Sequence, residues 1–326
     1  RGDRTMELLL YFSDSEIGLI GILVLLFLVQ IGYYAGIYAK PLRTAKRLRL
    51  LVDDQQKKNL PPVSVIVYAK NESENLKRNL PSLLSQNYPD YEVIVINDGS
   101  TELDSSNLEN WIDTNRNFIN IIYKKRTNKG ITKTLNEMIN LSSGKYIALI
   151  ASDDYFINNT FSKRVDILEN NKTKLMLVAD AIVVDDDGKL LFQSAMFEQR
   201  KAPKKNYFTD SGLKKEIIKR WSFVGPTSFI NKELFDIVGN YNENLLIEDW
   251  DFYLRVVSKD LMLFFDEKVA AYRWHENNIS KDETKNYLRD LCACETQKIN
   301  IKNFKFPYNV LLWLRTKKCF KRLNQK

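Results

Sequence analysis

Short apolar runs alternate with one-sided helical segments along the first half of the chain. The runs are as short and as continuously apolar as strands that are buried on both faces. Between the first two runs, the segment 72–85 has Leu76, Leu80 and Leu83 on one face of a helix. This rhythm predicts an α/β fold with a mostly parallel sheet flanked by helices. The predicted strands cover residues 63–67, 91–96, 121–123 and 147–150.

The second half of the chain has a less regular pattern. Residues 176–184, 261–265 and 269–272 have the composition of further strands. The aspartate-rich residues 185–188 predict a solvated hairpin turn. Residues 199–219 are polar and rich in lysine, and they indicate a mobile loop near a site.

One stretch near the start, residues 17–39, contains no charged side chain and is long enough to cross about 30 Å of hydrocarbon as a helix. Five basic residues follow within 40–49, whereas residues 6–16 contain three acids and no base. The positive-inside rule then predicts a single-pass protein of the inner membrane whose catalytic domain is cytoplasmic. A signal peptide is the alternative, but it requires a basic leader and a small-residue cleavage site.

The basic charge gathers at the two ends of the chain. The formal net charge is +8, and no acidic residue occurs from Ile301 onward. Residues 304–323 mix apolar and basic side chains, which predicts a basic amphipathic C-terminal tail. Such a tail lies on an anionic membrane, which would then be a partner, or it packs on its own domain. Because no stripe of basic and aromatic residues crosses the central domain, we expect no nucleic-acid partner.

These patterns divide the chain into five parts. The residues before Met6 are left out of the fold reasoning. A polar linker ends in Pro61 and Pro62, just before the first predicted strand. The expected parts are an N-terminal extension (1–16), a transmembrane helix (17–39), a basic juxtamembrane linker (40–61), a catalytic α/β domain (62–285) and a helical basic tail (286–326).

Cysteine and histidine are scarce. The three cysteines are Cys292, Cys294 and Cys319, an odd number without a CxxC pair. This count argues against a disulfide framework or a zinc site and fits a reducing compartment. His275 is the one histidine in the sequence, so a metal centre with several histidine ligands is excluded.

Two adjacent carboxylates, Asp153 and Asp154, directly follow the fourth predicted strand. Holding two acids side by side is costly unless a cation separates them. Oxygen ligands of this kind suit Mg²⁺ or Mn²⁺. The alternative is a solvated loop after a strand.

Further polar residues follow the other predicted strands. Tyr68, Lys70 and Glu72 come after the first strand, and Asp98 ends the second. Because ligands bind beyond the carboxyl ends of parallel strands, we expect these side chains to line one sheet edge. The sequence contains neither a glycine-rich dinucleotide loop nor a P-loop, which argues against nicotinamide, flavin and P-loop nucleotide sites. A nucleotide held by acids and a metal instead indicates a nucleotide-sugar site.

Four motifs follow one another along the chain. They are Val63-Ser64-Val65-Ile66-Val67, Val95-Ile96-Asn97-Asp98-Gly99-Ser100-Thr101, Ala151-Ser152-Asp153-Asp154 and Glu248-Asp249-Trp250-Asp251. Their order and spacing resemble those of family 2 glycosyltransferases of the GT-A (Rossmann-like) fold, and the resemblance covers about residues 62 to 280. The resemblance implies an inverting transferase that moves a sugar from a nucleoside diphosphate donor to a hydroxyl group. UDP is the expected nucleoside diphosphate. The implied acceptor is a glycan or a lipid-linked glycan in envelope polysaccharide synthesis.

The resemblance also implies residue roles. Asp249 is the implied general base, at the start of a helix predicted near residue 247. Asp98 would accept a hydrogen bond from the uracil imide. Asp153, Asp154 and His275 are the implied contacts to a Mn²⁺ or Mg²⁺ ion, although a structural role for the histidine stays open. The implied donor-binding residues are Tyr68, Lys70, Glu72, Asp98 and Asp153.

The chain departs from the family pattern in three places. Ala151 stands where many relatives have a further acid, and Glu102 stands where aspartate is common. The Gln-x-x-Arg-Trp motif of processive polymerases is missing, since Ala270 precedes Arg273 and Trp274. The last departure favours addition of one or a few sugars. Two rival functions remain: transfer to a polyprenyl phosphate, which needs no base, and a non-catalytic nucleotide- or glycan-binding module.

Overall fold

The computed structural model describes residues 21, 23–30, 60–79, 81–84, 86–117, 120–245, 247–274 and 286–325. The chain separates into two compact units, residues 1–55 and 56–326. In the first unit the described residues form one short helix over 21 and 23–30.

The transmembrane prediction has to be corrected. Within the described ranges, every helix is too short or too polar to span a bilayer. At about 1.5 Å per residue, a helix over 23–30 falls far short of the roughly 30 Å of hydrocarbon. The remaining positions of the predicted span 17–39 lie outside the described residues. The predicted single-pass localisation in the inner membrane is therefore contradicted.

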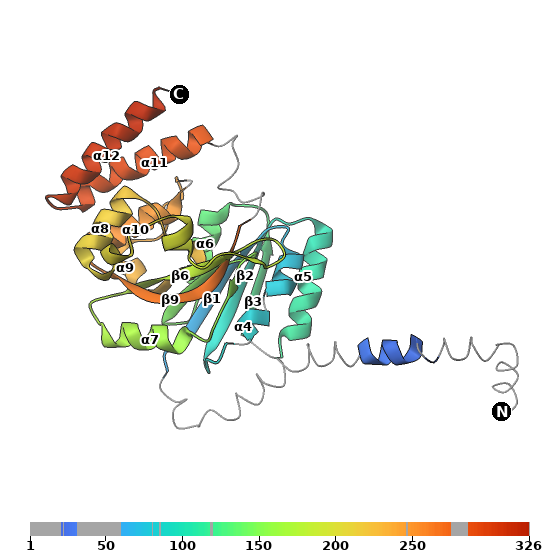
Figure 1. The fold of residues 1–326 in the computed structure, drawn as a ribbon. Helices are drawn as coiled ribbons and strands as arrows, with labels where there is room; N and C mark the ends of the chain where they lie inside the picture. Colours follow the sequence, from blue (N-terminus) through green and yellow to red (C-terminus); the bar gives the residue numbers. More distant parts are fainter. Residues whose placement is uncertain are drawn as a thin grey trace, which may run out of the picture. The chain divides into compact units, whose positions relative to one another are not determined.

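The second unit is built on one nine-stranded sheet (Figure 1). Its strands follow the order β3-β2-β1-β4-β8-β6-β9-β5, and β7 pairs with β6. The strand bounds are β1 Val63–Ala69, β2 Tyr91–Asp98, β3 Asn120–Arg126, β4 Tyr146–Ala151, β5 Tyr155–Phe156, β6 Met176–Val184, β7 Leu190–Phe192, β8 Phe229–Asn231 and β9 Met262–Arg273.

The sheet is mixed, which corrects the prediction of a mostly parallel one. Strands β1 to β4 are parallel to one another, as the strand-helix rhythm predicted. The three-residue β8 then pairs antiparallel with both β4 and β6, while β5 and β7 add further antiparallel edges. Residues 261–265 and 269–272 belong to the single strand β9, whose pairing with β6 shifts register around Asp180.

Helices cover both faces of the sheet, so a GT-A-like α/β architecture is observed (Figure 1). One core cluster gathers Leu76, Leu108 and Val165, and the other gathers Met138 and Phe252. The α-helices are α3 Ser73–Asn79, α4 Pro81–Leu84, α5 Glu102–Asn115, α6 Ile131–Leu141, α7 Phe161–Asn170, α8 Asp210–Lys219, α9 Leu234–Val238, α10 Glu248–Ser258, α11 Asn286–Asn300 and α12 Tyr308–Leu323. The shorter turns are η2 Ala195–Gln199, η3 Lys204–Phe208, η4 Gly225–Thr227 and η7 Ile301–Asn303.

The C-terminal segment folds back on its own domain. Helices α11 and α12 pack side by side, α11 also contacts α10, and α12 contacts α8. Leu312 is fully buried in this packing. A disulfide joins Cys294 to Cys319 across the two helices, with 5.5 Å between their Cα atoms. The expectation of reduced cysteines is therefore wrong. Residues 25 positions apart in sequence become neighbours only when the two helices pair.

Candidate active site

The carboxyl ends of β1, β2 and β4 meet at one edge of the sheet. The register places Ala69 opposite Asn97, and Tyr68 opposite both Ile96 and Ala151. The structure therefore brings the residues after these strands together, as the strand pattern predicted.

Asp98 is fully buried, and its carboxylate accepts three hydrogen bonds. The Arg126 Nε donates to it at 3.0 Å, and the backbone amides of Lys129 and Gly130 donate at 2.9 Å. Gly130 has a φ of 88°, which an L side chain rarely adopts, and this conformation helps to turn its amide toward the carboxylate. A carboxylate offers about four acceptor positions, so about one remains for a ligand.

Tyr68, near the end of β1, lies close enough to this carboxylate to be affected by its charge. Burial raises the pKa of the Tyr68 phenol to about 12, with smaller contributions from the charges of Asp98 and Glu72. The phenol is therefore protonated at neutral pH and can donate a hydrogen bond. Glu72 accepts from the Asn75 amide at 2.6 Å, and Lys70 is half-buried just after the strand.

Asp153 and Asp154 occupy the turn after β4, and Asp154 is buried. The backbone N–H of Arg273 donates to Asp154 Oδ1 at 2.8 Å, and the Arg273 guanidinium donates to the carbonyls of Asp153, Asp185 and Asp186. Burial, followed by the neighbouring charge of Asp153, raises the pKa of Asp154 well above its usual range. No ion pair reaches the Asp154 carboxylate from the described part of the chain.

Two adjacent carboxylates, of which Asp154 is buried with a raised pKa, fit a hard divalent cation. Mg²⁺ in particular is bound through one or two carboxylates, with water and substrate phosphates completing its shell. Across the described ranges, no cluster of three acids, histidines or cysteines forms a complete metal cage. His275, the third predicted contact, lies outside the described residues.

Asp249 and Glu248 open helix α10, and both are partly exposed. Burial, followed by the charge of Glu248, raises the pKa of Asp249 well above its usual range. Burial also raises the pKa of Glu248 to about 7. Asp249 Oδ1 accepts the Trp250 amide at 2.8 Å, which keeps the carboxylate at the helix start.

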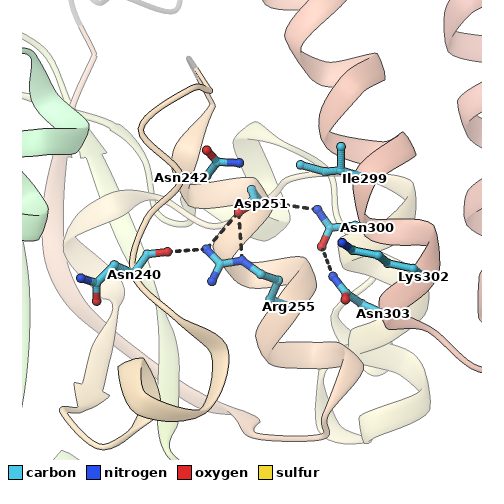
Figure 2. Close-up of a pocket in the computed structure, with 8 residues that line it drawn as sticks. All are labelled: Asn240, Asn242, Asp251, Arg255, Ile299, Asn300, Lys302 and Asn303. Atoms are coloured by element: carbon cyan, nitrogen blue, oxygen red, sulfur yellow. Dashed lines mark hydrogen bonds and ion pairs between the residues drawn. The ribbon is translucent and has the colours of Figure 1, made fainter.

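The buried face of α10 is anchored by a polar network. Asp251 accepts from the Arg255 Nε at 2.9 Å and from the Asn300 amide at 2.7 Å (Figure 2). Arg255 also donates to the carbonyls of Gly239 and Asn240. A cavity of about 440 Å³ lies over this network. The network ties α10 to the segment before it and to α11, so the position of the helix start is fixed.

Arg200 is a site residue that the sequence reasoning missed. Its guanidinium donates to the Phe223 carbonyl at 2.8 Å and lies 6.0 Å from the centre of the Tyr272 ring. Burial raises the pKa of Tyr272, as it does that of Asp249, and the positive charge of Arg200 opposes both increases. The charges of Asp153 and Asp154 contribute to the raised pKa of Tyr272. Arg200 and Tyr272 therefore link the strand-end acids electrostatically to the start of α10.

The sequence held one signal for Arg200. It is the single arginine in the lysine-rich segment 199–219. That segment was expected to be a mobile loop, whereas most of it folds into η3 and α8. The guanidinium therefore projects from an ordered part of the fold.

Comparisons with known proteins agree with this architecture. The family described as glycosyl transferase family 2 matches residues 64–238. An uncharacterized glycosyltransferase of Haemophilus influenzae is 31% identical over 232 residues, which cover 68% of this chain and 68% of the relative.

Solved structures share the fold. The S. aureus TarS fragment 1–349 in complex with UDP-GlcNAc superimposes with a TM-score of 0.57 and 19% identity, over 77% of this chain and 69% of that one. The mannosyltransferase PcManGT from Pyrobaculum calidifontis, in complex with GDP-Man and Mn²⁺, gives a TM-score of 0.58 and 16% identity, over 88% and 79%. The family match spans more than half of the chain, and the chain therefore belongs to glycosyl transferase family 2 and is a glycosyltransferase.

Proposed function

We propose that this glycosyltransferase moves a sugar from a UDP-sugar to a hydroxyl group of a glycan or lipid-linked glycan, with inversion and with Mn²⁺ or Mg²⁺. Envelope polysaccharide synthesis is the proposed setting. The observation that carries the proposal is that burial raises the pKa values of two carboxyl groups, Asp154 after β4 and Asp249 at the start of α10. Such carboxylates are suited to a cation and to proton transfer, respectively.

Asp249 is proposed to act as the general base. The acceptor oxygen attacks the anomeric carbon as its proton passes to the Asp249 carboxylate, and the bond to the nucleoside diphosphate breaks on the opposite face. A carboxylate whose pKa lies closer to the working pH is the stronger base, so its raised pKa favours this step. The charge of Arg200 acts in the opposite direction and limits the rise of this pKa.

The donor is proposed to lie along the edge formed by β1, β2 and β4. Tyr68, Lys70 and Glu72 would contact the nucleotide, and the remaining acceptor position of Asp98 would bind the uracil imide. Asp153 and Asp154 would hold the cation, with His275 as a proposed further contact. When bound, the cation supplies positive charge to the departing diphosphate. The TarS complex with UDP-GlcNAc and the PcManGT complex with Mn²⁺ support this choice of donor and ion.

The test is a thermal-shift screen of nucleotide sugars with and without Mn²⁺, followed by transfer assays with the donor that binds. A ligand that binds only the native state raises its stability, so a UDP-sugar should raise the melting temperature more in the presence of Mn²⁺. Transfer to a polyprenyl phosphate that survives Asp249→Asn would establish the rival reaction. Binding of UDP-sugars without transfer or hydrolysis would establish a binding module.

A further inference from the structure

A second cavity, of about 460 Å³, opens between α11 and α12. Three of its lining side chains are cationic, namely Arg315, Lys318 and Arg322. Their spacing of three and four residues places them on one face of α12. The cavity shares no lining residue with the strand ends or with α10. The remaining lining residues are Asp290, Gln297, Cys319, Leu323 and Gln325.

The three cations share the cavity with one carboxylate, that of Asp290, so the lining carries a net positive charge. Within the described part of the chain, no carboxylate forms an ion pair with Arg315, Lys318 or Arg322. The Arg315 Nε is buried without a hydrogen-bond partner. Burial, followed by the charges of Arg322 and Arg220, lowers the pKa of Arg315. Leaving the buried Nε–H donor of Arg315 unpaired costs free energy, and an anion bound in the cavity would reduce that cost.

Gln297, which also lines the cavity, has an acceptor atom without a hydrogen-bond partner. Gln297 is buried, and its Oε1 has no hydrogen-bond partner, whereas its Nε2 donates to the Ala293 carbonyl at 3.0 Å. A ligand that satisfies both atoms must accept from arginine and donate to the amide oxygen. The monoanion of a phosphate monoester, which is populated near and below its second pKa of about 6, does both, because it carries one P–OH group and two oxygens that share one negative charge.

We propose that this cavity binds a phosphate-bearing group, either a soluble phosphate or a phospholipid headgroup. The guanidinium forks of Arg315 and Arg322 suit phosphate oxygens, and Lys318 adds a point charge at the rim. The Cys294–Cys319 disulfide joins the two helices beside the cavity, so its walls are held together before the ligand arrives. The inference stands apart from the transfer reaction and uses none of its residues.

The test is calorimetric titration of the full chain with inorganic phosphate near pH 6, with EDTA present so that no metal recruits phosphate to the other site. We expect saturable binding that Arg315→Gln weakens about tenfold or more, since a hydrogen bond to a charged group contributes roughly 1.5–3 kcal/mol. Lys318→Gln should weaken it less. Its side chain is exposed, so the variant folds even if Arg315→Gln does not. The matched control is Lys321→Gln, which removes the same charge from α12 outside the cavity.

A second arm identifies the source of the phosphate. Sedimentation is measured with phosphatidylcholine vesicles that contain or lack phosphatidic acid. Binding only to the phosphatidic acid vesicles, with loss in the Arg315 and Lys318 variants, assigns a headgroup, whereas binding of inorganic phosphate alone assigns a soluble ligand. The inference is overturned if neither probe saturates, if sulfate binds as tightly as phosphate, or if Lys321→Gln weakens binding as much as the cavity variants do.

Discussion

Asp98 ends β2 and Asp154 follows β4 at the same edge of the sheet, yet the two carboxylates have different partners. Asp98 receives the Arg126 guanidinium and two backbone amides, all from β3 and the start of α6. Asp154 receives one backbone amide, and its pKa is raised by burial and by Asp153. Asp249 resembles Asp154, because burial and Glu248 raise its pKa. A carboxylate that receives an ion pair and two amide donors holds the edge together, whereas Asp154 and Asp249, whose anions are disfavoured by burial, are available to ligand and proton.

The largest effect in this comparison is expected from a change at Asp249, whose pKa is raised. Asp249→Asn keeps the shape of the side chain but removes the proton acceptor, so kcat should fall about 10³-fold. UDP-sugar binding, measured by calorimetry with Mn²⁺ present, should be retained. Unchanged turnover would remove Asp249 from the role of base. Loss of donor binding would show that the residue holds the nucleotide instead.

At Asp98, whose carboxylate accepts hydrogen bonds from Arg126 and two backbone amides, the expected effect is on stability. Asp98→Asn removes one of the two carboxylates that pair with the nearly buried Arg126, the other being Glu137, so the free energy of unfolding should fall by about 2 kcal/mol. The measurement is urea unfolding in the absence of ligands. The control is Glu102→Gln, which breaks an exposed ion pair with Lys125 and should change stability by less than about 1 kcal/mol. Equal stabilities for both variants would contradict the structural role given to Asp98.

Arg200 acts on Asp249, and its removal should have a smaller effect on catalysis than Asp249→Asn. Its charge lowers the pKa of Asp249, so Arg200→Gln should raise that pKa further. The acid limb of the kcat/KM profile should then move to higher pH, with about a tenfold loss below it, worth about 1.4 kcal/mol. Lys201→Gln, at the exposed neighbouring position, is the control. A loss of activity without movement of the acid limb would leave Arg200 with a packing role alone.

The smallest effect concerns Glu248. Its native pKa is raised to about 7, above the ordinary value of 4.5, so the native state binds the proton more tightly than the unfolded state. This contribution to stability is complete below about pH 4.5 and is lost as the pH rises through about 7. Glu248→Gln removes the free-energy cost of ionising this carboxyl group in the native state. Because the side chain is partly exposed, the gain above pH 7 should be about 1 kcal/mol.

The measurement for Glu248 is urea unfolding of both proteins at pH 5 and at pH 8. The stability difference between Glu248→Gln and the original chain should grow with pH. Glu74→Gln, at a position whose side chain is 79% exposed, should show no such growth. A constant difference across the two pH values would mean that Glu248 is not held with a raised pKa.

Some features of the site followed from local pattern. The apolar runs that became β1, β2 and β4 are continuous in sequence, and parallel strands bring their carboxyl ends to one edge, so the meeting of Tyr68, Asp98 and Asp154 could be predicted. Other features had no local signal. The three residues of β8 are too few to show a period, and their antiparallel pairing with β4 made the sheet mixed.

The sequence by itself determined where the buried strands lie, which acids end them and which family motifs they carry, because these depend on neighbours a few positions apart. Only the tertiary structure decided that Arg126 neutralises Asp98, that Arg200 stands near Asp249, and that Cys294 reaches Cys319. The charge state of each acid depends on burial and on partners distant in the chain, and folding alone brings those partners within reach.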